Sequence, residues 1–172
     1  MAFDQIERRT IGAFSADAMG DAQWERSDLR VLVSASPQTK GSFVRRLVQD
    51  LAATAGVEVR PIPGRRGNRR RVGKVVCEIK FSMESPARFQ QVRPPDNGGG
   101  YQYLVGIAAQ PDRMVYWVIP ADDVAELFAN DAITFQHGED SRWFRAQLDG
   151  SDDFAPYRYD RRGFVDQLRV FG

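Results

Sequence analysis

Glu78 and Lys80 are the residues whose types and spacing best suit chemistry on a phosphate group. In residues 75–81 apolar side chains alternate with these two, as in a half-buried strand, so both charged groups are expected on one face, about 7 Å apart. Phosphodiester hydrolysis needs a divalent cation and a base or cation near the attacking oxygen. The Glu78 carboxylate and the Ile79 carbonyl can offer oxygen ligands to Mg²⁺, or to Mn²⁺ in its place, while Lys80 reaches the same water or phosphate. An ordinary strand with a charged outer face has the same pattern.

A basic stretch precedes this strand. Seven basic residues and no acidic residue lie between Arg60 and Lys74, although the net charge of the whole chain is only +1. Such a local positive pole on a near-neutral protein predicts a directed contact with phosphate, and arginines there can also read guanine edges. A solvated loop tip is the alternative. The residues predicted to contact nucleic acid are, in this loop, Arg65, Arg66, Arg69, Arg70, Arg71 and Lys74, and, beyond it, Arg93.

Helix and strand patterns surround the strand in the order of an α/β domain. Apolar residues recur at helical spacing from Ser42 to Ala55, with Ser42 as the expected cap. Continuous apolar runs at 101–109 and 114–119 are typical of central strands. The other segments predict, in chain order, a strand at 31–33, a strand at 57–60, a long loop at 61–73 closing a hairpin with 75–81, a helix at 85–93 and an acidic helical turn at 122–128. We expect one domain, residues 1–172.

Four segments in this region carry a resemblance to a known family: VCEIKFS at 76–82, FQQVR at 89–93, YQYL at 101–104 and YWVIP at 116–120. In this order they resemble the PD-(D/E)xK nuclease superfamily, in its restriction-endonuclease-like branch, over residues 42–120. The resemblance implies a mixed central sheet flanked by helices, with the Glu and Lys on the second strand of a hairpin and a following helix that carries Gln and Arg. By position, it makes Glu78 the metal ligand, Lys80 the catalytic lysine, and Gln91 and Arg93 supporting polar groups.

Two carboxylates that this family usually supplies are missing. The family places a metal-binding Asp before the Glu, where this chain reads GNRRR at 67–71, and its first helix often begins with a Glu, where this chain has VRR at 44–46. In a hairpin centred near residue 68, Glu58 would lie opposite Glu78, so Glu58 is the predicted replacement ligand. Asp50 on the first helix is a weaker substitute.

The resulting hypothesis is a Mg²⁺-dependent endonuclease that acts on double-stranded DNA, of the type II restriction kind. Cutting both strands requires two active sites, which favours a homodimer. If no second acid approaches Glu78, we expect a catalytically defective DNA-binding module or one half of a composite site. A protein-interaction domain that uses the acidic, aromatic C-terminal region is a third alternative.

Composition limits the class of protein, its location in the cell and the metals that it can bind. With 42% apolar and 27% charged residues the chain reads as globular, and no run of about 18 apolar residues predicts a membrane span. The N-terminus lacks the pattern of a signal peptide, so a cytoplasmic location is expected. One cysteine and one histidine cannot form a zinc cluster, and His137 is expected to be a hydrogen-bonding loop residue.

Overall fold

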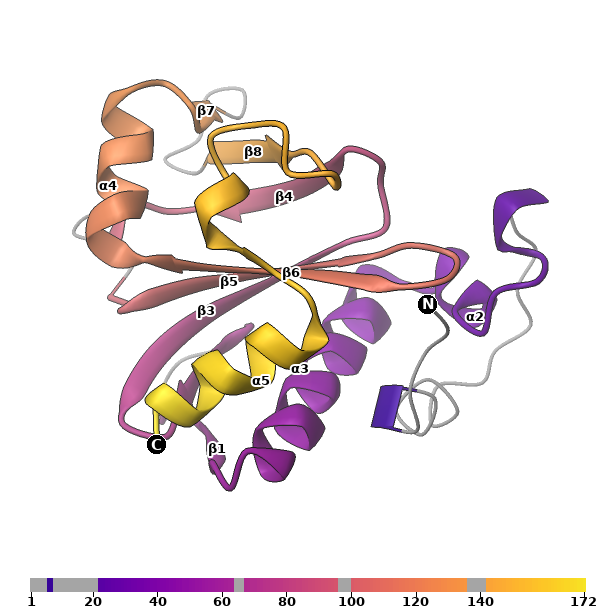
Figure 1. Ribbon diagram of the computed structural model, residues 1–172, viewed down its shortest axis with the longest axis horizontal. Helices are drawn as coiled ribbons and strands as arrows, with labels where there is room; N and C mark the ends of the chain where they lie inside the picture. Colours follow the sequence, from indigo (N-terminus) through magenta and orange to yellow (C-terminus); the bar gives the residue numbers. More distant parts are fainter. Residues whose placement is uncertain (1–5, 8–21, 64–66, 96–99, 136–141) are drawn as a thin grey trace.

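The computed structural model describes residues 6–7, 22–63, 67–95, 100–135 and 142–172 (Figure 1). Its elements, in chain order, are η1 (Ala22–Trp24), α2 (Arg30–Val33), α3 (Pro37–Thr54), β1 (Val59–Pro61), β2 (Arg69–Val72), β3 (Val75–Ser82), β4 (Ala87–Val92), β5 (Tyr103–Ala109), β6 (Met114–Pro120), α4 (Ala121–Ala129), β7 (Thr134–Phe135), β8 (Arg142–Ala146), η3 (Ala155–Tyr157), β9 (Arg158–Tyr159) and α5 (Arg161–Val170). None of the helices within these residues is long and apolar enough to cross a membrane.

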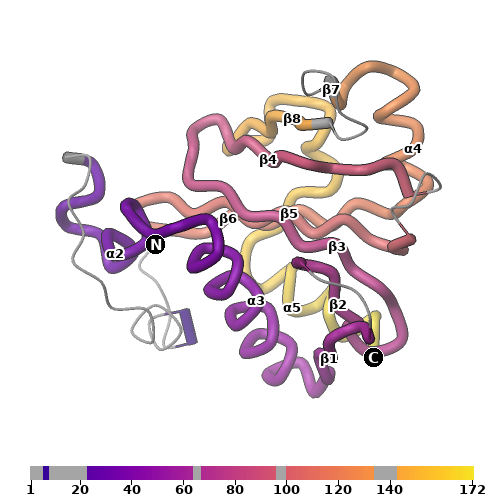
Figure 2. Tube along the Cα trace, turned by 180° about the vertical axis from the view of Figure 1, so that it is seen from behind, coloured from indigo at the N-terminus to yellow at the C-terminus, as the bar shows by residue number. Residues whose placement is uncertain are grey.

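A mixed six-stranded sheet forms the middle layer, in the order β1-β2-β3-β5-β6-β9. All its pairs are antiparallel except β3 with β5, which are parallel. Helices α3 and α5 cover one face, and a small sheet of order β4-β8-β7 lies with α4 over the other (Figures 1 and 2). The predicted single α/β domain with a mixed sheet flanked by helices is confirmed at this level.

Helix α3 packs on the face of β3 that carries Cys77 and Ile79, both fully buried. Burying one such apolar side chain contributes roughly 1.5–3 kcal/mol, so this stripe anchors the helix to the sheet. The cap is Ser36, six residues before the predicted cap Ser42: its hydroxyl accepts the Thr39 N–H at 3.1 Å, and Pro37 fits the first turn.

Strand β4 crosses over the opposite face of the sheet. The Phe89 ring lies 5.6 Å from the Trp117 ring of β6 and 4.9 Å from the Phe144 ring of β8, measured between centroids. Gly106 on β5 makes this approach possible, because a Cβ there would lie 3.0 Å from the Phe89 ring. This cluster of buried aromatic side chains therefore joins the small sheet to the six-stranded sheet.

Two sequence predictions of secondary structure were wrong. Residues 31–33 belong to the helical turn α2, and 85–93 contain strand β4 in place of a helix. In β4, Ala87, Phe89 and Val92 are buried, and the pairing with β8 shifts between Phe89 and Val92. The extra residue of this β-bulge turns a period of two into a step of three, which mimics helical spacing.

The predicted long-looped hairpin was also wrong, because β2 lies between its two strands. Strands β2 and β3 form a tight hairpin instead, closed by Gly73 (φ +56°) and Lys74. The end of α5 locks this turn: the Lys74 N–H donates to the Phe171 carbonyl at 2.8 Å, and a Cβ at position 73 would lie 2.1 Å from that oxygen.

Candidate functional site

Glu78 and Lys80 lie on the face of β3 opposite to Cys77 and Ile79, beneath β4. The Lys80 ammonium lies 3.2 Å from Glu78 Oε1, and Arg69 Nε lies 3.0 Å from Glu78 Oε2. These side chains are only 12–14% exposed. We call Arg69, Glu78 and Lys80 the ion cluster; its two cations and one carboxylate carry a formal charge of +1.

Arg69 reaches this cluster through strand register. In the β2–β3 hairpin Val72 pairs with Val75, so Arg69 pairs directly with Glu78, and directly opposed side chains share a face. Sequence reasoning assigned Arg69 to a phosphate-binding loop and missed this contact. The signal that could have revealed it is Gly73 followed by Lys74 between apolar residues, which marks a two-residue turn and sets the register.

The β4 bulge completes the surroundings of Lys80. Gln91 has φ +55°, a conformation that costs a non-glycine residue of order 1 kcal/mol, and its carbonyl accepts a hydrogen bond from the Lys80 ammonium at 2.7 Å. Burial lowers the pKa of Lys80, and the neighbouring Glu78 carboxylate opposes that shift. The structure thus brings Gln91 to the predicted site, through its main chain rather than its side chain.

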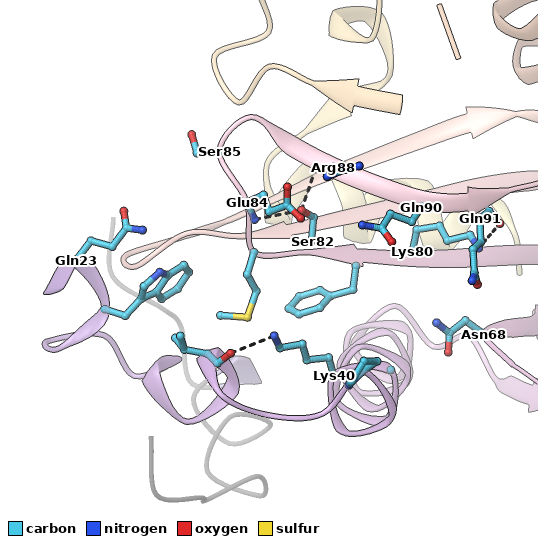
Figure 3. Close-up of a pocket in the computed structure, with 16 residues that line it drawn as sticks. Gln23, Lys40, Asn68, Lys80, Ser82, Glu84, Ser85, Arg88, Gln90 and Gln91 are labelled. Carbon is cyan, nitrogen blue, oxygen red and sulfur yellow. Dashed lines mark hydrogen bonds between the residues drawn. The ribbon is translucent and has the colours of Figure 1, made fainter. Parts of the chain in front are cut away.

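A groove of about 760 Å³ opens beside Lys80, between the end of β3, the outer side of β4 and the start of α3. In Figure 3, Gln90 and Gln91 lie on one side of β3, and Asn68 and Lys40 lie on the other. Arg88 also lines the groove, and its Nε is buried without a hydrogen-bond acceptor. Among the described residues that line the groove, Glu84 is the one with a carboxylate, and Lys40, Lys80 and Arg88 outnumber it.

The wall of the groove includes an open strand edge. Pairing of β2 with β3 ends at Arg69 and Glu78, and the Ile79 N–H then donates to the Asn68 carbonyl at 3.1 Å. Beyond this point, no strand among the described residues pairs with that side of β3. Because successive residues alternate in direction, the Phe81 main chain points to the same side as that of Ile79, toward the groove.

Comparisons with protein-family models, curated proteins and solved structures found no match. The geometry must therefore carry the functional argument.

The predicted replacement ligand Glu58 does not join the cluster. Its carbonyl accepts the Gly73 N–H at the far end of β2, its side chain is 65% exposed, and its carboxylate pairs with Arg60. The hydrogen bond from the Arg60 guanidinium lowers the pKa of the Glu58 carboxyl. The prediction failed because β2 intervenes between residues 58 and 78. Asp50 binds Arg46 on α3, which packs against the other face of β3.

The remaining predicted contacts are distributed over several elements. Arg70 and Arg71 lie within β2, Lys74 lies in the hairpin turn, and Arg93 follows β4; all except the half-buried Arg70 are exposed. Arg65, Arg66 and His137 lie outside the described residues. The predicted arginine-rich loop is thus partly a strand.

The ion cluster does not fit a divalent metal as it stands. Both carboxylate oxygens of Glu78 contact a cation, Arg69 at one and Lys80 at the other. Within the part of the chain that the structure describes, no three His, Cys, Asp or Glu side chains cluster as metal ligands would. The guanidinium of Arg69 stands where the cation would bind this carboxylate.

Proposed function

We propose that this chain binds the phosphate backbone of double-stranded DNA at the groove beside Lys80, without a metal. The observation that carries the proposal is the Arg69–Glu78–Lys80 cluster, in which the carboxylate is neutralised by two cations and a positive charge is left over. A buried carboxylate in that state does not repel phosphate. The Glu78 carboxylate holds two cations in place, and its single negative charge leaves the cluster with a net positive charge.

The surrounding side chains suit a polyanion. Lys40 and Arg88 line the groove with Lys80, so three cationic side chains can attract a phosphate group there. Arg71 alternates with Arg70 on β2 and so shares the face of Arg69, where it is exposed. These groups attract phosphate from several directions and carry no base preference by themselves.

The resemblance of residues 42–120 to restriction endonucleases directs the proposal toward DNA. A helix, α3, precedes an antiparallel meander whose last strand carries Glu78 and Lys80, and a parallel strand follows. On this reading the chain is a DNA-binding module on a restriction-endonuclease-like fold in which Arg69 replaces the metal. It deviates from that fold at β4, where the resemblance implies a helix.

An endonuclease is the second candidate, favoured by one observation: Glu78 and Lys80 share a strand face at 3.2 Å beside the bulged Gln91. It would need a further carboxylate at Glu78, for example from a second copy in a composite site. Neither Glu58 nor Asp50 supplies that carboxylate.

The experiment measures the affinity for a short fluorescently labelled DNA duplex by fluorescence anisotropy. The titration is repeated over a series of salt concentrations, once in EDTA and once in Mg²⁺. We expect equal affinity in both, with affinity falling steeply as salt rises. Arg71→Gln and Arg93→Gln should each reduce the salt slope by about 0.9, the value for one phosphate contact. Arg169→Gln on α5, which removes an equally exposed charge, is the matched control and should change nothing.

Plasmid cleavage in Mg²⁺ or Mn²⁺ separates the two candidates. Cutting that disappears in both Glu78→Ala and Lys80→Ala, with folding checked by circular dichroism, would replace our proposal by the endonuclease. Absence of salt-dependent DNA binding in the unmodified protein would overturn both and favour a protein-interaction role.

A further inference from the structure

A second pocket, on the α3 side of β2, holds two arginines that have no acidic partner. Arg45 of α3 donates to Asn68 Oδ1 at 2.6 Å and to Ser42 Oγ at 2.8 Å. Arg70 of β2 donates to the carbonyls of Arg69 at 2.7 Å and Gly67 at 3.0 Å. All four acceptors are neutral oxygens. Within the described residues, neither guanidinium forms an ion pair with a carboxylate.

These side chains enclose a concave space of about 360 Å³, which Gln49 and Ser42 also line. No carboxylate of the described residues lines this pocket. The Ser42 oxygen already accepts from Arg45, so its own O–H is free to donate, and Gln49 adds an amide donor. The pocket therefore presents hydrogen-bond donors from two strong cations, a hydroxyl and an amide.

The guanidinium groups of Arg45 and Arg70 repel each other, because both are positively charged. Burial lowers the pKa of Arg70, and the charge of Arg45 lowers it further. A purely structural role accounts for Arg45, which ties α3 to Asn68, but leaves the charge of Arg70 without compensation. Half-buried like charges become favourable when an anion lies between them, and the planar fork of arginine matches the oxygens of a phosphoryl group.

We infer that the Arg45–Arg70 pocket is a phosphoryl-binding site, separate from the groove beside Lys80. Asn68 stands between the two, because it lines the groove and also receives the hydrogen bond from Arg45. The phosphoryl group is either that of a small phosphate-bearing ligand or a backbone phosphate of a nucleic-acid strand. In the second case the inference deepens the proposed DNA-binding function and rests on it.

The first test uses inorganic phosphate alone, so its outcome does not depend on DNA. We would follow thermal unfolding of the full chain in phosphate and in chloride at matched ionic strength and pH. Phosphate should raise the melting temperature of the unmodified protein beyond the chloride value, because it binds only the folded state. Arg70→Gln should weaken phosphate affinity about tenfold or more, the value of one charge-assisted hydrogen bond. Arg169→Gln on α5, which lies outside both proposed phosphate sites, is the control.

A further readout separates ligand binding from a structural role. In chloride, Arg70→Gln should be no less stable than the unmodified protein, because the substitution relieves the repulsion from Arg45. If Arg45→Gln fails to fold through loss of its bond to Asn68, Arg70→Gln and Arg70→Lys still decide the matter. Equal melting temperatures in phosphate and chloride would overturn the site, as would an unchanged phosphate response in Arg70→Gln.

The DNA arm then distinguishes the two sources of the phosphoryl group. A salt slope for duplex binding that falls by about 0.9 in Arg70→Gln identifies a backbone phosphate. An unchanged slope, with the phosphate response intact in the unmodified protein, identifies a free phosphate-bearing ligand. Failure of all DNA binding would remove the proposed function and leave this site standing.

Discussion

Replacing Glu78 by Gln keeps the shape of the side chain and removes the one negative charge of the ion cluster. Arg69 and Lys80 would then face each other with only 12% and 13% of their side chains exposed. Removing one partner of a buried ion pair costs 3–5 kcal/mol when the remaining charge is uncompensated. Because the cluster keeps some contact with solvent, we expect a loss near the lower limit, about 3 kcal/mol in the free energy of unfolding.

A double-mutant cycle isolates the pair from other effects. Unfolding in urea would be monitored by tryptophan fluorescence for the unmodified protein, Glu78→Gln, Arg69→Met and the double variant. We expect a coupling energy of about 2 kcal/mol, because the double variant removes the repulsion between Arg69 and Lys80 that Glu78→Gln creates, while Lys80 is present in every variant. The control is the same cycle on Glu58 and Arg60, whose side chains are 65% and 66% exposed and should show no measurable coupling.

The result that would refute this reasoning is a Glu78–Arg69 coupling as small as that of the exposed control. Such a result would mean that the carboxylate is not held by Arg69 in solution. Glu78 would then be free to take another cation, and the argument against a metal at this site would fail.

Three other predictions follow from single contacts. The pKa of Lys80 is lowered below its ordinary 10.5, so between the lowered pKa and pH 10.5 the unfolded chain binds more protons than the folded one. The stability of the unmodified protein relative to Lys80→Met should therefore rise as pH approaches 10.5. A difference in urea unfolding that does not change with pH would contradict this. Burial raises the pKa of the Cys77 thiol to about 12, so a thiol reagent should label Cys77 only after denaturation, and rapid labelling of the native protein would refute its burial. Gln91→Gly should relieve the positive φ, and this gain of about 1 kcal/mol offsets the entropy cost of glycine, so the free energy of unfolding should change by less than about 0.5 kcal/mol. Gln90→Gly should lower it by about 0.5–1 kcal/mol, and equal losses in thermal unfolding would argue against the bulge.

The parts of the fold that follow from local patterns were predictable. Strands β5 and β6 are continuous apolar runs, and the middle of β3 alternates between the buried Cys77 and Ile79 and the charged Glu78 and Lys80. Their predicted bounds agree with the structure within one or two residues, and α4 agrees equally well with its predicted acidic turn. In each case one periodic signal dominates the segment.

Strand β2 was not predictable in the same way. Its sequence, Arg-Arg-Arg-Val, offers one apolar residue, so no period of two is visible. The strand exists because its main chain pairs with β1 and β3, a tertiary effect that outweighs weak local preference. This single omission explains why Glu58 was placed opposite Glu78 and why Arg69 was assigned to a loop.

The contact between Gly73 and Phe171 has a consequence for how this sequence can diverge. Position 73 cannot accept a side chain while the Phe171 carbonyl occupies its present place. In chains that share this ancestry, a residue larger than glycine at position 73 is therefore expected only together with a change in the last turn of α5. Covariation between position 73, near the middle of the chain, and the last turn of α5 would therefore record the contact that holds the arginine-bearing hairpin against this helix.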